Sequence, residues 1–159
     1  MRGLASLLLV GSVGLAGCGF TPLYAQGAAG TDASRIAVHT PDDRLGYRLR
    51  EQLEDALAVS RSAAPLHRLD LKVESARRPL GRRIDDTASR YELTVRAEWT
   101  LTPLAGGEAM TGVETATVTY AAADQPYAAI AAQQDGEDRA AADLARLLRL
   151  DVLRALSGR

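Results

Sequence analysis

Residues 91–102 alternate strictly between apolar and polar side chains, and this run constrains the fold more than any other part of the chain. Polar residues fill the even positions, and the apolar series is Tyr91, Leu93, Val95, Ala97, Trp99 and Leu101. Such period-two alternation is typical of a half-buried antiparallel strand. We therefore expect a sheet with one face on a core and one polar face, with Trp99, the only tryptophan, in that core.

Three further strands are expected beside this one. Residues 35–40 alternate with Ile36 and Val38 on one side, and residues 66–77 alternate in the same way. In the second run one face carries His67, Leu69, Leu71, Val73 and Ser75. Residues 108–120 are rich in Thr and Val, which favour strands; the sequence leaves open which side faces inward, and Gly112 is a candidate β-bulge. A polar loop is expected at 78–88, because Pro79 and Gly81 interrupt the pattern, and a turn at 103–107.

Two segments have the apolar spacing of helices. In residues 44–59 the apolar stripe consists of Leu45, Leu49, Leu53, Ala56 and Leu57, and Pro41-Asp42-Asp43 supplies a start with an Asp cap. Residues 127–156 form a second, Leu-rich helix with a weak point around Gly136, since glycine costs about 1 kcal/mol relative to alanine in a helix.

The element order is therefore βαβββα. Because the first helix connects the first two strands, these can pair in parallel, and the last three strands then form an antiparallel meander. We expect a single α/β (α+β) two-layer sandwich over residues 35–159, with a four-stranded mixed sheet and both helices on one face.

The N-terminus is a processing signal rather than part of the fold. Residues 1–17 have a positive start and a short apolar run, which is typical of a secretory signal peptide. The run ends in Leu15-Ala16-Gly17-Cys18, which resembles the bacterial lipoprotein box, so Cys18 is expected to carry the lipid and residues 18–34 to form an acylated tether. An ordinary secretion signal with an incidental Cys is the alternative. Gly19, rather than Asp, favours sorting to the outer membrane.

The composition excludes several classes of function. Lys and Arg total 19 against 20 Asp and Glu, so a basic nucleic-acid-binding domain is not expected. One Cys and two His provide neither an internal disulfide nor a zinc site. Asp85-Asp86 is better explained as solvated charge in a loop than as a catalytic pair, and His67 as a core or edge residue. We expect no catalytic residue, no metal and no cofactor.

One charged cluster stands out. Arg77, Arg78, Arg82, Arg83 and Arg90 fall within a short stretch at one end of the expected sheet. Arginine suits the bidentate capture of phosphate and carboxylate groups. The cluster is either an anion-binding edge or a solvated loop whose arginines pair with Asp85 and Asp86.

Three segments resemble one known family. Cys18-Gly19-Phe20-Thr21-Pro22-Leu23-Tyr24 is similar to the start of the lipopolysaccharide-assembly lipoproteins (LptE), especially their alphaproteobacterial branch. Residues 43–50 with Leu53 resemble the family's first helix. Tyr120, Tyr127-Ala128 and the Ala-rich stretch 135–142 before Leu144 resemble its last helix.

The resemblance implies a non-enzymatic protein with two helices on a four-stranded sheet. It further implies a lipid-anchored protein of the cell outer membrane, on the periplasmic side, that plugs and helps assemble the β-barrel lipopolysaccharide translocon (LptD-like) and binds lipopolysaccharide during export. In that case the five arginines are candidate lipopolysaccharide-binding residues. The alternatives are an auxiliary lipoprotein of a phospholipid or solvent transporter and a lipid-tethered periplasmic enzyme.

Overall fold

The computed structural model describes residues 32–82, 84 and 88–158. The elements follow the order β1 (Ile36–His39), α3 (Arg44–Ala56), β2 (His67–Arg82), β3 (Ala88–Pro103), β4 (Met110–Ala121) and α4 (Pro126–Ser157). The predicted βαβββα order is confirmed. The signal peptide, Cys18 and nearly all of the expected tether lie outside the described residues.

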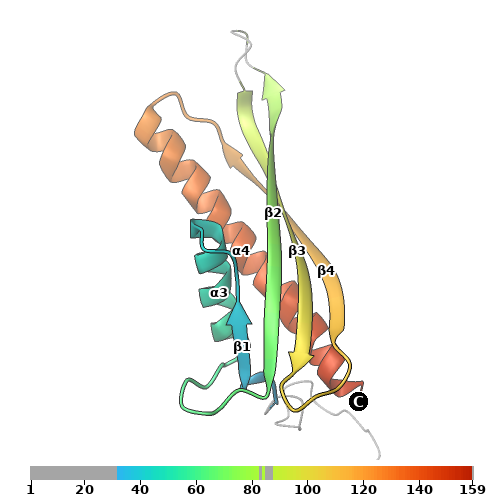
Figure 1. The fold of residues 1–159 in the computed structure, drawn as a ribbon. Helices are drawn as coiled ribbons and strands as arrows, with labels where there is room; N and C mark the ends of the chain where they lie inside the picture. Colours follow the sequence, from blue (N-terminus) through green and yellow to red (C-terminus); the bar gives the residue numbers. More distant parts are fainter. Residues whose placement is uncertain (1–31, 83, 85–87, 159) are drawn as a thin grey trace, which may run out of the picture.

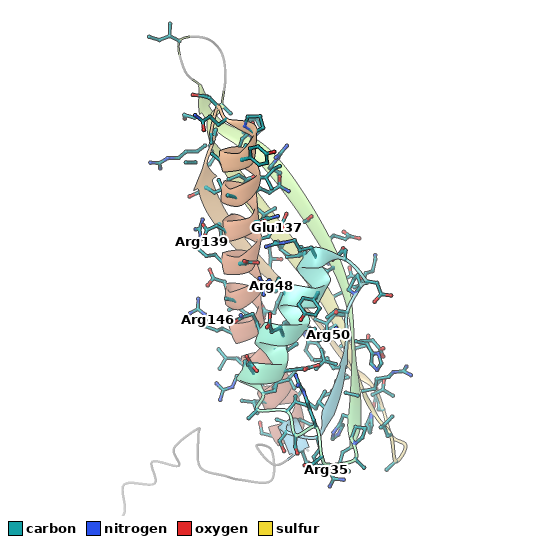
Figure 2. The ribbon with its side chains drawn as sticks, turned by 90° about the vertical axis from the view of Figure 1, so that its left-hand side faces the viewer. Arg35, Arg48, Arg50, Glu137, Arg139 and Arg146 are labelled. Carbon is teal, nitrogen blue, oxygen red and sulfur yellow. The ribbon has the colours of Figure 1, made fainter. Side chains whose placement is uncertain are left out.

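The four strands form one sheet in the order β1-β2-β3-β4. β1 runs parallel to β2, with Ile36 opposite His67, and the other two pairs are antiparallel. Figure 1 shows both helices on the same side of this sheet, and Figure 2 shows α3 lying along α4. The predicted two-layer arrangement is confirmed, with α3 as the crossover that parallel pairing requires.

The predicted loop at 78–88 is wrong, because β2 and β3 continue through most of it. β2 extends to Arg82 and β3 begins at Ala88, with Arg82 paired to Ala88. Pro79 interrupts the hydrophobic pattern but not the strand. β1 pairs only with residues 67–70 of β2, so Pro79 lies on a free edge, where a missing N–H breaks no ladder bond.

The first helix is shorter than predicted. It begins at Arg44, where the Asp43 carboxylate accepts a 2.6 Å hydrogen bond from the Gly46 N–H, and it ends at Ala56 rather than residue 59. Ala58 has φ +52°, in the left-handed region, which a continuing α-helix does not allow. The predicted Asp cap is confirmed. The second helix is continuous through the expected weak point.

The core lies between the helices and the odd-numbered face of the central strands. Its fully buried side chains come from every layer: Ile36, Leu49, Leu53, Leu69, Val95, Leu101, Leu144, Leu148 and Val152. The alternation that defines β3 is borne out, since Leu93, Val95, Ala97, Trp99 and Leu101 are all buried. In β4 the inward residues are Ala116, Val118 and Tyr120, and Ala33, just before β1, is also buried.

Ion pairs fix α3 against α4. Arg44 contacts Glu137 at 2.7 Å and Asp138 at 3.1 Å, and Arg48 contacts Asp138 at 3.4 Å. Figure 2 shows Arg48 and Glu137 close together where the two helices meet. These side chains are partly exposed, so each pair contributes little alone. As a network they set the register in which α3 lies on α4.

Gly112 does not form a bulge. Residues 110–121 of β4 pair with 90–101 of β3 without interruption, and Gly112 lies opposite Trp99. A Cβ atom built on Gly112 would lie 2.6 Å from Cε2 and Cζ2 of the Trp99 ring. The absence of a side chain at Gly112 therefore leaves the space that the Trp99 indole occupies.

Glu114 is the acidic residue on the helix-covered side of β4, and it gives the fold a pH dependence. Burial raises the pKa of the Glu114 carboxyl, and neighbouring Asp151 on α4 raises it further. A raised carboxyl pKa means that the ionised form is penalised in the folded state, so Glu114 destabilises the fold at neutral pH and ceases to do so as the pH falls. Glu114→Gln should therefore raise the melting temperature at pH 7, and the gain should shrink in acid.

Glu98 provides the control for this prediction. It lies on the uncovered face, where a hydrogen bond from Arg96 lowers the pKa of its carboxyl. Glu98→Gln should therefore cause a small loss of stability at neutral pH, of opposite sign. Melting curves of both variants between pH 4 and pH 8 check the prediction, and a lower melting temperature for Glu114→Gln at pH 7 would contradict it.

Candidate functional site: the basic end of the sheet

The β2–β3 hairpin carries the arginine cluster found in the sequence. Arg77, Arg78 and Arg82 lie in β2 and Arg90 lies in β3, whereas Arg83 and Asp85-Asp86 lie outside the described residues. Arg78 is paired with Glu92, and Leu80 with Arg90. The hairpin projects at the end of the sheet where α4 begins (Figure 1). The cluster is thus part of a twisted ribbon rather than of a loop.

Strand alternation separates the cluster between two faces. Arg77 has the parity of Leu69 and Leu71 and lies on the side covered by the helices, whereas Arg78 and Arg90 lie on the uncovered side. Neighbours in the sequence therefore have different surroundings and different partners.

Arg77 is held by residues of three other elements. Its Cζ lies 4.7 Å from the centre of the Tyr91 ring on β3. Its Nη1 donates to the Tyr120 hydroxyl on β4 at 3.5 Å and to Gln133 Oε1 on α4 at 3.3 Å. The hydrogen bond to Tyr120 raises the pKa of the guanidinium. Arg77 thus joins the far end of the sheet to α4, a role that the sequence did not indicate.

The exposed arginines of the hairpin differ in whether their guanidinium groups have an ion-pair partner among the described residues. Arg78 Nε donates to Glu92 Oε1 at 2.8 Å, which raises the pKa of Arg78, although its side chain stays 70% exposed. Arg90 is exposed and makes no ion pair with any described residue. Of Arg77, Arg78 and Arg90, the cluster members with described side chains, Arg90 is accordingly the one without a described partner.

Exposed apolar side chains lie at the same end of the molecule. Tyr127 and Ile130, in the first turns of α4, are 89% and 55% exposed, and Ile84 at the hairpin tip is fully exposed. Gln133, on the next turn of α4, contacts Arg77, so this part of α4 lies beside the hairpin. Cationic and apolar groups thus share one end, an arrangement suited to a ligand that is both anionic and apolar.

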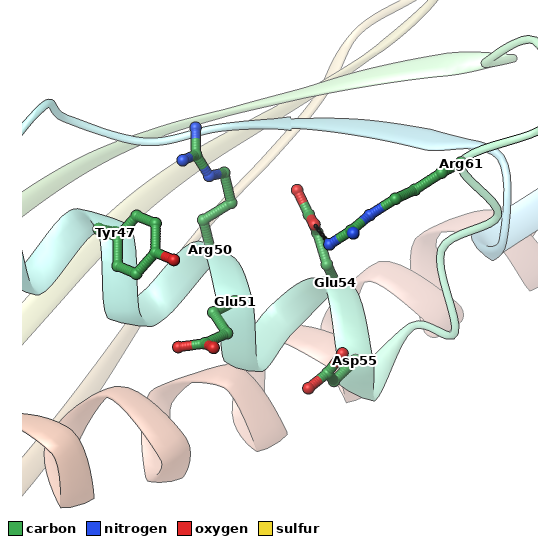
Figure 3. Close-up of a pocket in the computed structure, with 6 residues that line it drawn as sticks. All are labelled: Tyr47, Arg50, Glu51, Glu54, Asp55 and Arg61. Carbon is green, nitrogen blue, oxygen red and sulfur yellow. Dashed lines mark ion pairs between the residues drawn. The ribbon is translucent and has the colours of Figure 1, made fainter.

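The hollow beside α3 is not a second candidate site. This shallow hollow of about 260 Å³ lies on the outer side of α3, lined by Tyr47, Arg50, Glu51, Glu54, Asp55 and Arg61 (Figure 3). Three of its charged groups are engaged locally: Arg61 lies 3.5 Å from Glu54, and Arg50 lies over the Tyr47 ring. Within residues 32–82, 84 and 88–158, no three His, Cys, Asp or Glu side chains gather as metal ligands, and no helix could span a membrane.

Comparison with known protein families gives one decisive match. The model of the lipopolysaccharide-assembly family, LptE, matches residues 32–152, which include every described strand and nearly all of α4. The chain belongs to the LptE family. This membership agrees with the resemblance carried by residues 18–24, which lie outside the matched range, and it favours lipopolysaccharide assembly over a phospholipid or solvent transporter.

Solved structures agree with membership in the LptE family. A protein from Caulobacter crescentus CB15 described as a lipoprotein is 39% identical, with a TM-score of 0.70 over 83% of this chain and 97% of that chain. A minor lipoprotein from Acinetobacter baumannii shares the fold at 15% identity, with a TM-score of 0.52 over 77% of this chain and 92% of that chain. No curated protein sequence matches the chain.

Proposed function

We propose that this LptE-family chain is a lipoprotein of the outer membrane that plugs the β-barrel lipopolysaccharide translocon, helps that barrel to assemble, and binds lipopolysaccharide on its way to the outer leaflet. Cys18 is the proposed site of lipid attachment, on the periplasmic side. Family membership supports the role in lipopolysaccharide assembly. The role is one of binding and assembly rather than catalysis.

The uncovered face of the sheet supports the plug. On this face, residues of opposite charge lie across from one another on β2 and β3: Glu74 lies opposite Arg96, and Lys72 lies opposite Glu98. Threonines occupy much of the same face on β4. The interior of a large outer-membrane barrel is polar and filled with water or with a plug. A charge-balanced sheet face can enter such a lumen without burying unpaired charge.

The observation that carries lipopolysaccharide binding is the basic and apolar end of the sheet. Lipopolysaccharide has phosphate and carboxylate groups beside acyl chains. Arginine pairs with these anions through charge-assisted hydrogen bonds, and exposed Tyr127, Ile130 and Ile84 offer apolar contact nearby. Arg78, Arg82, Arg83 and Arg90 are the proposed anion ligands, and Arg77 supports them by fixing the hairpin to α4.

The translocon partner can be tested by affinity purification from detergent-solubilised membranes. We expect a large outer-membrane β-barrel to be recovered in near-equal amount, identified by mass spectrometry. A matched purification of an unrelated outer-membrane lipoprotein is the control. Recovery of an inner-membrane transporter, or of no partner, would contradict the plug.

The anion-binding residues can be tested by charge reversal. Arg90→Glu should weaken lipopolysaccharide binding about tenfold or more, because each charge-assisted contact is worth about 1.5–3 kcal/mol. Separately, Arg82→Glu with Arg83→Glu removes two such contacts and should weaken binding about a hundredfold or more. Arg61→Glu is the matched control, since Arg61 is 89% exposed and lies between α3 and β2, far from the hairpin tip. Unchanged binding in both hairpin variants would show that the basic end of the sheet is not the lipopolysaccharide-binding site.

A further inference from the structure

A chain of hydrogen bonds runs from the basic hairpin to α3 along one side of α4. It begins at Arg77 on β2, whose Nη1 donates to Gln133 Oε1 on α4 at 3.3 Å. Gln133 Nε2 donates in turn to Glu137 Oε1, one helical turn further along α4, at 2.9 Å. The other carboxylate oxygen of Glu137 accepts from Arg44 Nη1 on α3 at 2.7 Å. Three elements that are far apart in the sequence are thus joined through two side chains of α4.

Gln133 is the member of this chain whose chemistry admits few replacements. A guanidinium only donates hydrogen bonds, and an ionised carboxylate only accepts them. The residue between Arg77 and Glu137 must therefore accept on one side and donate on the other. A glutamine amide does both, with Oε1 toward Arg77 and Nε2 toward Glu137. A carboxylate at position 133 would serve Arg77 alone, and an ammonium group would serve Glu137 alone.

α4 lies close to the sheet at the place where the chain crosses between them. Gly136 is buried, and a Cβ atom there would lie 2.8 Å from Cδ1 of the Tyr120 ring. The centre of the Tyr120 ring lies 5.6 Å from that of Tyr91, the ring over which the Arg77 guanidinium is placed. The close approach at Gly136 and the two tyrosines thus hold Arg77 within reach of Gln133.

The end of the hairpin extends past the rest of the sheet (Figure 1). β4 pairs with residues 90–101 of β3, and β1 pairs with residues 67–70 of β2. Beyond Arg90 the described sheet is therefore a two-stranded ribbon, in which Arg82 is paired with Ala88. Such a ribbon is marginally stable by itself and twists strongly. Its direction relative to the helices is set at its base, where Arg77 connects β2 to α4.

We propose that Gln133 is the positioning residue of the hairpin: it holds Arg77, and through Glu137 it ties the direction of the basic end to the packing of α3 on α4. The consequence for lipopolysaccharide rests on the proposed function. Arg78 and Arg90 bind one anionic ligand together only while the ribbon that carries them keeps one direction, and a binding site that is held in place before the ligand arrives binds more tightly. The positioning itself requires no ligand.

Hydrogen exchange of the full chain in detergent, without lipopolysaccharide, tests the positioning. Gln133→Met removes both polar contacts at nearly the same side-chain length. It should speed exchange of the hairpin amides, residues 80–82 and 88–90, about threefold to tenfold, because the contact that fixes the ribbon at its base is lost. Gln134→Met, at the exposed neighbouring position, is the matched control and should leave exchange unchanged. Hairpin exchange that stays at the wild-type rate in Gln133→Met overturns the proposal.

Charged replacements test the polarity of the chain, which a purely structural role for Gln133 would not require. Gln133→Glu retains an acceptor for Arg77, so the hairpin amides should exchange as slowly as in the wild type. Gln133→Lys retains a donor for Glu137 but sets a second cation beside Arg77, so the hairpin amides should exchange at least as fast as in Gln133→Met. Equal hairpin exchange in the two charged variants contradicts the proposal.

Affinity for purified lipopolysaccharide tests the connection to α3. Arg44→Met removes the far end of the chain without changing the hairpin, and it should weaken binding about threefold, as should Gln133→Met. The double variant should bind no more weakly than Gln133→Met alone, because both changes act through the same chain. Arg50→Met, at another arginine of α3, is the control and should bind like the wild type.

Two results of the affinity experiment contradict the connection: wild-type affinity in Arg44→Met, or full additivity of the two changes. A wild type that does not bind lipopolysaccharide overturns the proposed function instead. In that case the exchange experiment, which uses no ligand, still decides whether Gln133 positions the hairpin.

Discussion

Replacing Gly112 with valine is expected to lower the free energy of unfolding by about 2–3 kcal/mol, the upper part of the range for overpacked cores. The new Cβ would lie 2.6 Å from two carbons of the Trp99 ring and 2.7 Å from its Nε1. Trp99 is 5% exposed and lies between Gly112 on β4 and Leu71 on β2, so the ring has no free side into which to move. The fold must therefore open around the indole or move β4.

A double-mutant cycle separates this clash from a general loss of strand geometry. Trp99→Leu alone should destabilise the fold by removing buried surface. In the Trp99→Leu background, however, Gly112→Val should cost much less than in the wild type, because the smaller side chain leaves room for the new methyl groups. Urea unfolding of the four proteins measures the cycle. Equal costs of Gly112→Val in both backgrounds would show that contact with Trp99 is not the cause.

Gly112 and Trp99 also show which features of the fold the sequence alone does not predict. The alternation at 91–102 predicts the strand, its buried face and the burial of Trp99, because each depends on neighbours within the strand. A glycine in a strand signals either a bulge or a close approach. Whether Gly112 forms a bulge or allows a close approach depends on which residue lies opposite it on the neighbouring strand. The spacing of residues within one strand does not determine that register. Pro79 is a similar case. A proline is tolerated within β2 there because β1 pairs only with residues 67–70 and leaves that edge free.

The arginine cluster shows the limit for the candidate site. Spacing alone places Arg77 with Arg78, Arg82, Arg83 and Arg90. The structure separates Arg77, because Tyr120 and Gln133, its hydrogen-bond partners, come from β4 and α4. No local pattern connects residues so far apart in the chain. The sequence thus places the cluster at one end of the sheet, whereas only the fold separates Arg77, which braces this end, from Arg78 and Arg90, which lie on the uncovered side.

Gly46→Ala is the second change with a large expected effect, and two opposing terms decide its sign. Alanine is favoured over glycine in a helix by about 1 kcal/mol, which alone predicts stabilisation. However, a Cβ on Gly46 would lie 2.2 Å from the backbone oxygen of Pro41 and 3.1 Å from Asp43 Oδ1. Relief of this contact requires moving the 41–43 backbone, which disrupts the Asp43 cap, worth about 1 kcal/mol. Arg44 ties the same helical turn to Glu137 and Asp138, which opposes a shift of α3.

The clash should therefore outweigh the helix preference, and Gly46→Ala should lower the free energy of unfolding by about 1–3 kcal/mol. Gly136→Ala is the matched control in α4. There the nearest atom is Cδ1 of the Tyr120 side chain, at 2.8 Å, and a ring can shift where a backbone carbonyl cannot. Its cost should be smaller, since the same gain in helix preference offsets a softer contact. Urea unfolding midpoints of the two variants decide the matter. If Gly46→Ala proves as stable as the wild type, the backbone at Pro41 is free to move, and α3 is positioned by its ion pairs with α4 and by its buried leucines rather than by its cap.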